Sequence, residues 1–318
     1  MSFSLKTKGE LARLEAEKSC CNKAELAALI GLNGELVYST EDKFNLKITV
    51  ENPAVARKIF KLIKILFAIN PEIKVRKNSS FKKSNYYLMV ITHVMGSQSI
   101  IKGLGLLKNH GSGDTFVHFP KDEIFEKRCC KRSYLRGAFL SGGSVSAPEK
   151  TYHLEFVAHE IEVALGVQRM MNTFGLNAKI VPRKKYQVVY LKEGDQIVEL
   201  LNIIGAHNAL LELENARILK EMRNNINRIV NCETANLSKT VNASVKQLEN
   251  IHLIQRTIGL DELPEALREL AKLRIQHEDA SLKELGEMMD PPVGKSGVNH
   301  RFRKMENLAE KIRQNRYV

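Results

Sequence analysis

Hydrophobic and polar positions over the first two thirds of the chain follow one order of patterns, and that order occurs twice. Each copy begins with a mostly apolar helical stretch, which an alternating segment follows: KFNLKITV in the first copy and TYHLEFVA in the second. An amphipathic helix, a hairpin of alternating segments and a closing helix complete each copy. The pattern therefore predicts an α+β domain of two αββαββα halves, at about residues 1–110 and 111–222.

Paired cysteines mark the start of both copies. Cys20 and Cys129 are 109 positions apart, and so are Leu26 and Leu135. The helix that follows each pair is rich in small residues: Ala27, Ala28, Gly31 and Gly34 in the first copy, and Gly137, Ala138, Ser141 and Gly142 in the second. Small residues allow two helix backbones to approach closely. The repeat therefore predicts a close, symmetric helix pair, although an ordinary buried pair is compatible with the same residues.

After the repeat the pattern becomes helical throughout. A long helical stretch is interrupted by the polar run NCETANLSKT, which predicts a linker over residues 223–240. The first domain then covers residues 1–222, and a small all-helical domain covers residues 241–318. Within that second domain Asp261 is expected to cap a helix that has Pro264 in its first turn.

The stretch SLKELGEMMDPPVGKSGVNHRFRKM has the pattern of a helix-turn-helix. Ser281 is expected to cap a short helix, DPPVGKSG forms the turn, and the next helix buries Val298, Phe302 and Met305 at helical spacing. Arginine and asparagine near the start of such a helix can bind guanine and adenine in the major groove. The candidate DNA-binding residues are Ser281, Lys283, Lys295, Ser296, Asn299, His300, Arg301, Arg303 and Lys304. A solvated helical bundle with a basic tail is the alternative.

Composition narrows the classes of function. The 318 residues are 43% hydrophobic and 27% charged, as in ordinary soluble proteins, and no uninterrupted apolar run approaches the length of a membrane span. The charged N-terminal stretch has no apolar signal region, so we expect a cytoplasmic protein without a membrane partner. A net charge of +13 favours a polyanionic partner such as nucleic acid, and a basic surface without a dedicated ligand is the alternative.

The five cysteines do not follow a metal-binding spacing. They are Cys20, Cys21, Cys129, Cys130 and Cys232, and no two of them form the C-x-x-C pattern of zinc sites. Neighbouring cysteines on a helix point about 100° apart, which suits burial of one and exposure of the other. We therefore expect structural thiols, no bound metal and no cofactor.

Two nine-residue stretches, LAALIGLNG at 26–34 and LRGAFLSGG at 135–143, resemble the signature motif of the LAGLIDADG homing endonucleases. In that family the two signature helices pack at a pseudo-twofold axis, and each ends in a carboxylate that binds catalytic metal. The resemblance puts Asn33 and Gly142 at the positions of the two acids. Because neither residue has a carboxylate, we expect a nuclease fold that has lost its metal sites and its activity.

In the resembled fold the paired sheets form a saddle whose hairpins lie on duplex DNA. The corresponding hairpins of this chain carry Arg76, Lys77, Lys82 and Lys83 in the first half, and Arg183, Lys184 and Lys185 in the second. These cations suit secondary contacts with phosphates. Lysines that keep edge strands from aggregating are an equally good interpretation.

A degenerate LAGLIDADG pair followed by a helix-turn-helix resembles the WhiA family over the whole chain. The run NRIVNCETANLSKTVNAS and the final SLKELGE and GVNHRFRKM carry this more specific resemblance. It implies a non-enzymatic, nucleoid-associated transcription regulator that binds double-stranded DNA and acts in cell division, chromosome segregation and, in some organisms, sporulation. A second transcription regulator is a candidate partner, and the oligomeric state stays open.

Two other functions are compatible with the sequence. The chain could be an interaction protein of division or segregation whose DNA binding is weak and largely non-specific. It could also be an active endonuclease, if carboxylates outside the two signature stretches held the metal.

Overall fold

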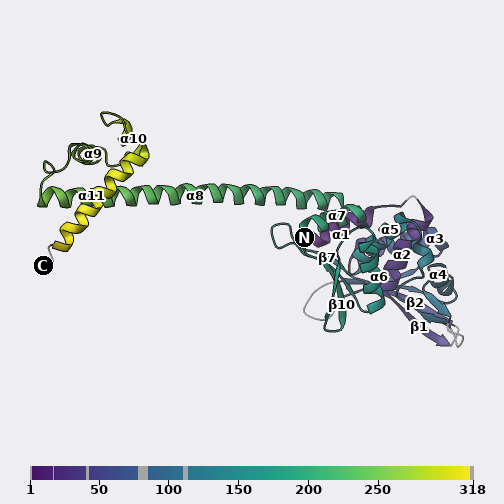
Figure 1. Cartoon of the computed structure of the whole chain (residues 1–318). Helices are drawn as coiled ribbons and strands as arrows, with labels where there is room; N and C mark the ends of the chain where they lie inside the picture. The colour runs from purple at the N-terminus through teal and green to yellow at the C-terminus, as the bar shows by residue number, and fades with distance from the viewer. Residues whose placement is uncertain (1, 17, 41–42, 78–84, 110–113, 316–318) are drawn as a thin grey trace. The chain divides into compact units, whose positions relative to one another are not determined.

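The computed structural model of the chain describes residues 2–16, 18–40, 43–77, 85–109 and 114–315 (Figure 1). These residues form two compact units, Met1–Lys220 and Glu221–Val318. Among the described helices, none is both long enough and apolar enough to cross a membrane.

The first unit contains the αββαββα order twice, so the predicted duplication is confirmed. The first copy consists of α2 (Ser19–Asn33), β1 (Gly34–Thr40), β2 (Lys43–Val50), α3 (Pro53–Phe67), β3 (Glu72–Lys77), β4 (Asn85–Ile91) and α4 (Ser97–Gly103). The second consists of α5 (Arg128–Gly142), β7 (Gly143–Val145), β8 (Leu154–Ala158), α6 (Ile161–Asn172), β9 (Lys179–Arg183), β10 (Tyr186–Leu191) and α7 (Gly194–Ile204).

Both copies build the same antiparallel sheet. The strand orders are β1-β2-β4-β3 and β7-β8-β10-β9, which correspond position by position. Along β2 and β8 alternate residues are buried, because one face of each sheet packs on helices while the other faces solvent. The buried side chains of both copies belong to one hydrophobic core, so the two halves form a single domain.

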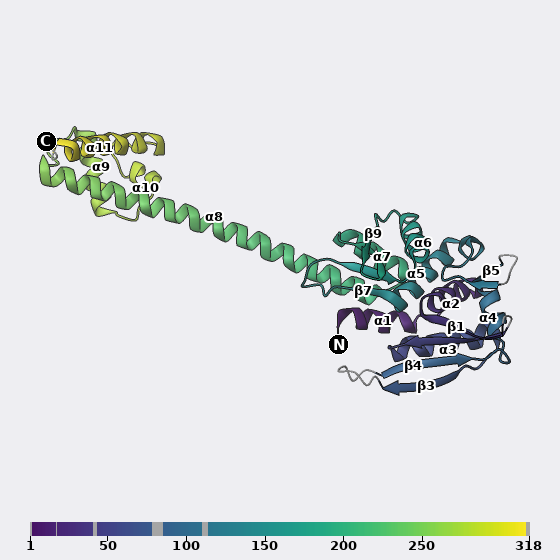
Figure 2. The same cartoon turned by 90° about the horizontal axis from the view of Figure 1, so that it is seen from below.

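Helices α2 and α5 lie side by side where the two copies meet (Figure 2). A Cβ atom at Gly137 of α5 would lie 2.5 Å from the carbonyl oxygen of Glu25 and 2.9 Å from the Cβ of Ala28, both in α2. A larger residue at 137 would therefore push the helices apart. The close symmetric pair predicted from the small residues is present.

Four short elements lie outside the repeat. They are α1 (Phe3–Arg13), β5 (Leu107–Asn109), β6 (Asp114–Phe116) and the 3₁₀ helix η1 (Asp122–Phe125). Helix α1 was not expected, because its sequence is charged throughout. It forms because Ser2 caps its first turn by accepting from Leu5 N, while Phe3, Thr7 and Leu11 give it one buried face.

The second unit is helical. It contains the end of α8 (His207–Thr257), then α9 (Glu265–Gln276), α10 (Leu282–Glu287) and α11 (Lys295–Asn315). The polar run within residues 223–240 was expected to interrupt the helix, and this is wrong, since α8 continues through that segment. That segment contains no glycine or proline, and its asparagines, serine and threonines each cost a helix only a few tenths of a kcal/mol. Asp261 is likewise not the cap of α9, which begins after Pro264.

Candidate nucleic-acid interface

The two positions that the resemblance matches to catalytic acids, Asn33 and Gly142, lie at the C-terminal ends of α2 and α5. Asn33 Nδ2 donates to the carbonyl oxygen of Leu29 at 2.8 Å and to Ser141 Oγ at 2.7 Å. The hydroxyl of Ser141 in turn donates to the carbonyl oxygen of Gly137 at 3.0 Å. The amide of Asn33 therefore joins the two helices, and both of its N–H donors are used inside the protein.

The second of these positions has no room for a side chain. A Cβ atom at Gly142 would lie 2.3 Å from the carbonyl oxygen of Val157 in β8. Because that oxygen belongs to the backbone of a paired strand, a carboxylate at 142 would require the strand to move.

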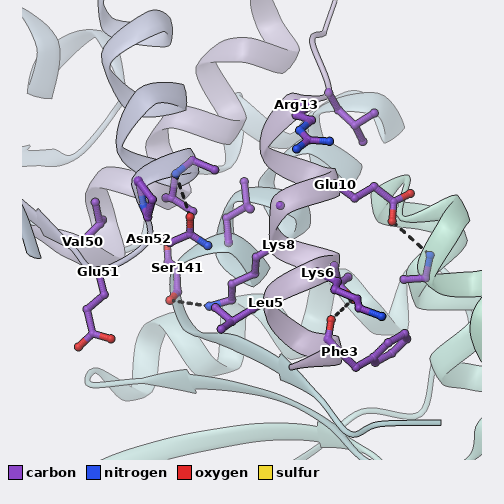
Figure 3. Close-up of a pocket in the computed structure, with 18 of the residues that line it drawn as sticks. Phe3, Leu5, Lys6, Lys8, Glu10, Arg13, Val50, Glu51, Asn52 and Ser141 are labelled. Atoms are coloured by element: carbon purple, nitrogen blue, oxygen red, sulfur yellow. Dashed lines mark hydrogen bonds between the residues drawn. The ribbon is translucent and has the colours of Figure 1, made fainter. Parts of the chain in front are cut away.

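A cation occupies the same neighbourhood. Lys8 of α1 points toward Ser141 and donates to its carbonyl oxygen at 3.4 Å (Figure 3). The two side chains line a cavity of about 1370 Å³ together with Asn33 and Glu51. Burial lowers the pKa of Lys8 to about 8, and the negative charge of Glu51 opposes that shift. Sequence reasoning missed this lysine, because only the fold brings α1 to the end of α5.

One buried carboxylate does lie between the signature helices. Glu25 is fully buried, 2.8 Å from Lys58 Nζ, and it accepts two hydrogen bonds from Arg136 at 2.8 and 3.0 Å. Lys58 also donates to the carbonyl oxygens of Leu11 and Leu14. Two cations thus compensate the charge of Glu25, which suits a structural ion pair between the two copies rather than a metal ligand.

The hairpins of the two sheets are partly described. Arg76 near the end of β3 is exposed, as are Arg183, Lys184 and Lys185 at the turn between β9 and β10. Arg183 lies 3.9 Å from Glu155, so a carboxylate on the same sheet already attracts this cation.

The remaining hairpin candidates are Lys77, Lys82 and Lys83. Lys77 ends β3, but its side chain and the whole of Lys82 and Lys83 lie outside the described residues. The two interpretations of the hairpin cations therefore both stay open.

The first helix of the helix-turn-helix begins as expected. Ser281 Oγ accepts from Glu284 N at 3.3 Å, and Glu284 Oε2 accepts from Ser281 N at 2.7 Å, which completes a capping box. Lys283 is exposed on this helix and lies 3.7 Å from Glu287, one turn later. The serine thus has a structural role here, while the charge of Lys283 is partly compensated.

A glycine holds the turn against this helix. The carbonyl oxygen of Gly286 accepts from Val293 N at 2.8 Å, and a Cβ atom at 286 would lie only 1.9 Å from Val293 O. The turn can approach α10 this closely because residue 286 has no side chain. This contact was not predicted, since a single glycine inside a short helix carries no sequence signal of its own.

The second helix, α11, has the predicted core. Val298, Phe302 and Met305 are buried, and they pack with residues of α8, α9 and α10 in a separate hydrophobic core. The exposed residues of its first turns include six of the candidates: Lys295, Ser296, Asn299, His300, Arg303 and Lys304. These side chains are free to reach a ligand.

Arg301 differs from its neighbours on α11. It is half-buried, and its Nη1 lies 3.0 Å from the sulfur of Met289, just before the turn. The expectation that it lies on the solvent face is therefore corrected: it lies at the edge of that face, beside the turn.

Arg274 fixes the segment that leads into α10. Its side chain is buried, and Nη1 donates to the carbonyl oxygens of His277, Glu278 and Ala280 at 3.4, 3.1 and 2.6 Å. Its guanidinium also lies over the ring of Phe302, 5.4 Å from the centroid. The sequence analysis did not single out this arginine.

The fold and this geometry define a class of protein with a duplicated LAGLIDADG-like unit and a helix-turn-helix unit. Three family models match the chain: the WhiA N-terminal LAGLIDADG-like domain at residues 19–107, the WhiA LAGLIDADG-like domain at 131–223 and the WhiA C-terminal HTH domain at 226–309. The chain therefore belongs to the WhiA family.

Individual relatives agree with that assignment. The "Probable cell division protein WhiA" of Alkaliphilus metalliredigens is 58% identical over 98% of this chain and 99% of that protein. The protein of the same name from Clostridium acetobutylicum is 54% identical over 99% of each. A crystal structure of full-length WhiA from Thermatoga maritima, 26% identical, covers 98% of this chain and 99% of that chain with a TM-score of 0.61.

Proposed function

We propose that the chain is a non-enzymatic, sequence-dependent DNA-binding protein that regulates transcription in cell division. The observation that carries this proposal is the exposed basic and polar surface of α11, which lies directly after a turn held in place by Gly286. In a helix-turn-helix the start of the second helix enters the major groove, where arginine and asparagine side chains distinguish bases. Relatives named as cell division proteins support the cellular process.

The environment of Asn33 and Gly142 supports the absence of nuclease activity. Asn33 is neutral and uses its amide N–H donors inside the protein, residue 142 has no room for an acid, and the amino group of Lys8 donates to the carbonyl oxygen of Ser141. Divalent metals in phosphodiester hydrolysis need hard, negatively charged oxygen ligands. A neighbouring cation would repel such a metal instead.

We extend the proposal to chromosome segregation, to sporulation where the organism sporulates, and to association with the nucleoid and with a second regulator. The resemblance to the family supports these finer roles. The cavity beside Lys8 and the two sheet hairpins are the surfaces of the first unit on which such a partner, or DNA, would be sought.

The test is a selection of binding sites from random duplex DNA with the full-length chain. We expect an enriched motif, and we expect Arg303→Ala/Lys304→Ala to lose it, while Lys272→Ala, at an exposed position of α9, keeps it. Binding titrations at several salt concentrations should give a selected-site affinity at least 10³-fold above that for random DNA.

The second candidate function is an interaction protein of division or segregation with weak DNA binding. Its supporting observation is the overall charge of +13, which by itself gives electrostatic binding to any duplex. Three results together would establish this function and reject the first. The chain would bind all DNA sequences with equal affinity, binding would depend steeply on salt, and the α11 variant would weaken binding only through its lost charge.

A further inference from the structure

Four cysteines from the two copies meet at one place in the first unit. Cys20 and Cys21 lie in the first turn of α2, and Cys129 and Cys130 lie in the first turn of α5. Their four sulfur atoms all lie within 4.8 Å of one another. In each pair the first cysteine is half-buried and the second is buried, and all four are free thiols.

The repeat explains how neighbouring cysteines come together without a C-x-x-C spacing. Two adjacent side chains on one helix diverge, so one pair offers an ion only part of a coordination sphere. The pseudo-twofold relation of α2 and α5 brings the other pair to the same point from the opposite helix. Spacing along one stretch of the chain does not reveal this cluster, because its two pairs lie about a hundred positions apart.

The sulfur separations suit a single ion. Four thiolates around tetrahedral zinc, each at about 2.3 Å, are separated from one another by roughly 3.8 Å. Small rotations of the side chains would close the separations seen here to that value. An iron–sulfur cluster places several iron and sulfide atoms between its cysteines, and would need the four sulfurs to be farther apart.

The ends of the two helices favour negative charge at this point. The side chains of the N-cap residues, Lys18 of α2 and Lys127 of α5, make no capping hydrogen bond to the first turn. Backbone N–H groups at these ends can therefore donate to thiolates, and the positive ends of two helix dipoles stabilise them. The ammonium group of Lys18 also attracts a thiolate at Cys129, which helps to offset the net charge of −2 of a four-thiolate zinc site.

We propose that Cys20, Cys21, Cys129 and Cys130 bind one zinc ion, which holds the N-terminal ends of α2 and α5 together. On binding, each thiol releases its proton to solvent and each sulfur donates an electron pair to the ion; no oxidation or reduction is involved. The site lies at the opposite end of α2 from Asn33, roughly 20 Å away along the helix. It is therefore separate from the lost endonuclease positions, and it does not depend on DNA binding.

The first test uses the intact wild-type chain, purified under reducing conditions and freed of metal by a chelator. Titration with Co²⁺ should produce the intense thiolate charge-transfer and visible bands of a tetrahedral four-sulfur site, saturating at one ion per chain. Addition of Zn²⁺ should abolish these bands and protect four thiols from alkylation. A folded chain that binds no Co²⁺ or Zn²⁺, or that shows the weak pink spectrum of octahedral oxygen ligation, would overturn the proposal.

The second test uses variants with a matched control. Cys20→Ser and Cys129→Ser replace the two half-buried ligands, and each should reduce zinc affinity by at least 100-fold, while Cys232→Ser, at an exposed position of α8, should bind zinc as the wild type does. The zinc-free wild-type chain should also unfold at a lower temperature than the zinc-bound chain. Equal zinc binding by all three variants, or recovery of the four cysteines as two disulfides from a reducing cytoplasm, would reject the site.

Discussion

Asn33 of α2 donates a hydrogen bond to Ser141 Oγ of α5 at 2.7 Å, so the two copies are joined by a neutral polar contact at the place that resembles a pair of catalytic acids. The contact joins Asn33, which the resemblance matches to the first acid, to Ser141, the residue next to Gly142 in the second copy. Here the position contributes to packing of the helix pair. A metal ligand at position 33 would thus have to displace an existing interaction.

We expect Asn33→Asp to show no nuclease activity. The new carboxylate would accept from Ser141 and attract Lys8, whose amino group lies 3.4 Å from the Ser141 carbonyl oxygen, and the second copy would still lack an acid. Incubation of the variant with supercoiled plasmid and Mg²⁺ or Mn²⁺, with gel analysis of nicking, checks this expectation. Metal-dependent nicking above that of the wild type would show that one acid is sufficient and that our account of the site is wrong.

Glu25→Gln should destabilise the first unit by about 3 kcal/mol. The substitution removes the buried charge that pairs with both the amino group of Lys58 and the guanidinium of Arg136, and breaking a buried ion pair on one side typically costs 3–5 kcal/mol. Denaturant unfolding monitored by circular dichroism measures this loss. Glu126→Gln, at an exposed position of the same unit, is the control and should change the free energy of unfolding by less than about 0.5 kcal/mol. Similar losses for both variants would show that Glu25 is not the centre of an ion-pair network.

The duplicated order of elements and the core of the helix-turn-helix could be predicted because both depend on local periodicity. Residues such as Val298 and Phe302 recur at helical spacing and are buried as that spacing requires. The same reasoning failed at residues 223–240, where a polar run was taken for a break. A polar sequence indicates that a segment is exposed to solvent, not that its helix is broken. An exposed helix against which nothing packs is as polar as a loop.

The contacts that define the candidate sites depend on residues far apart in the sequence. The cluster that contains Cys20 and Cys129 forms because a pseudo-twofold axis superposes two helix starts, which no spacing rule for a single stretch detects. Lys8 reaches Ser141 because α1 packs on α5, and the contact of Arg301 with Met289 depends on the path of the turn. Such contacts follow from the tertiary fold.

Arg301→Ala and Arg303→Ala should differ in their effects. Both are expected to weaken binding to a selected DNA site, by roughly 1–3 kcal/mol for a good base contact. Arg301→Ala should also lower the melting temperature of the second unit, because its side chain is half-buried on Met289, whereas Arg303 is exposed. Parallel melting curves and DNA titrations separate the two effects. A fall in melting temperature for Arg303→Ala alone would contradict the placement of both side chains.

The contribution of Lys8 to stability should depend on pH in a defined direction. Its pKa is lowered by burial from 10.5 to about 8, so between these pH values the folded chain holds fewer protons on Lys8 than the unfolded chain does. The free energy of unfolding that is due to this group therefore rises as the pH rises from about 8 to 10.5. Lys8→Met lacks the titrating group, and the wild-type value minus the Lys8→Met value should increase over that range. The control for loss of a lysine from α1 is Lys6→Met, whose side chain is 57% exposed. A difference that is constant or decreases with pH would refute the buried position of Lys8.

Gly286→Ala and Gly294→Ala provide a matched pair of substitutions in the helix-turn-helix. A methyl group at 286 would lie 1.9 Å from the carbonyl oxygen of Val293, a backbone atom that can move only with the turn, whereas at 294 nothing lies within 4 Å. We expect Gly286→Ala to cost 1–3 kcal/mol or more of stability in the second unit and to weaken DNA binding, because α11 shifts relative to α10. Gly294→Ala should change the stability by less than about 1 kcal/mol and leave DNA binding intact. Thermal unfolding and DNA titration of both variants measure the two effects. Should the alanine at 294 prove as harmful as that at 286, backbone freedom rather than the close approach to Val293 would be what this turn requires.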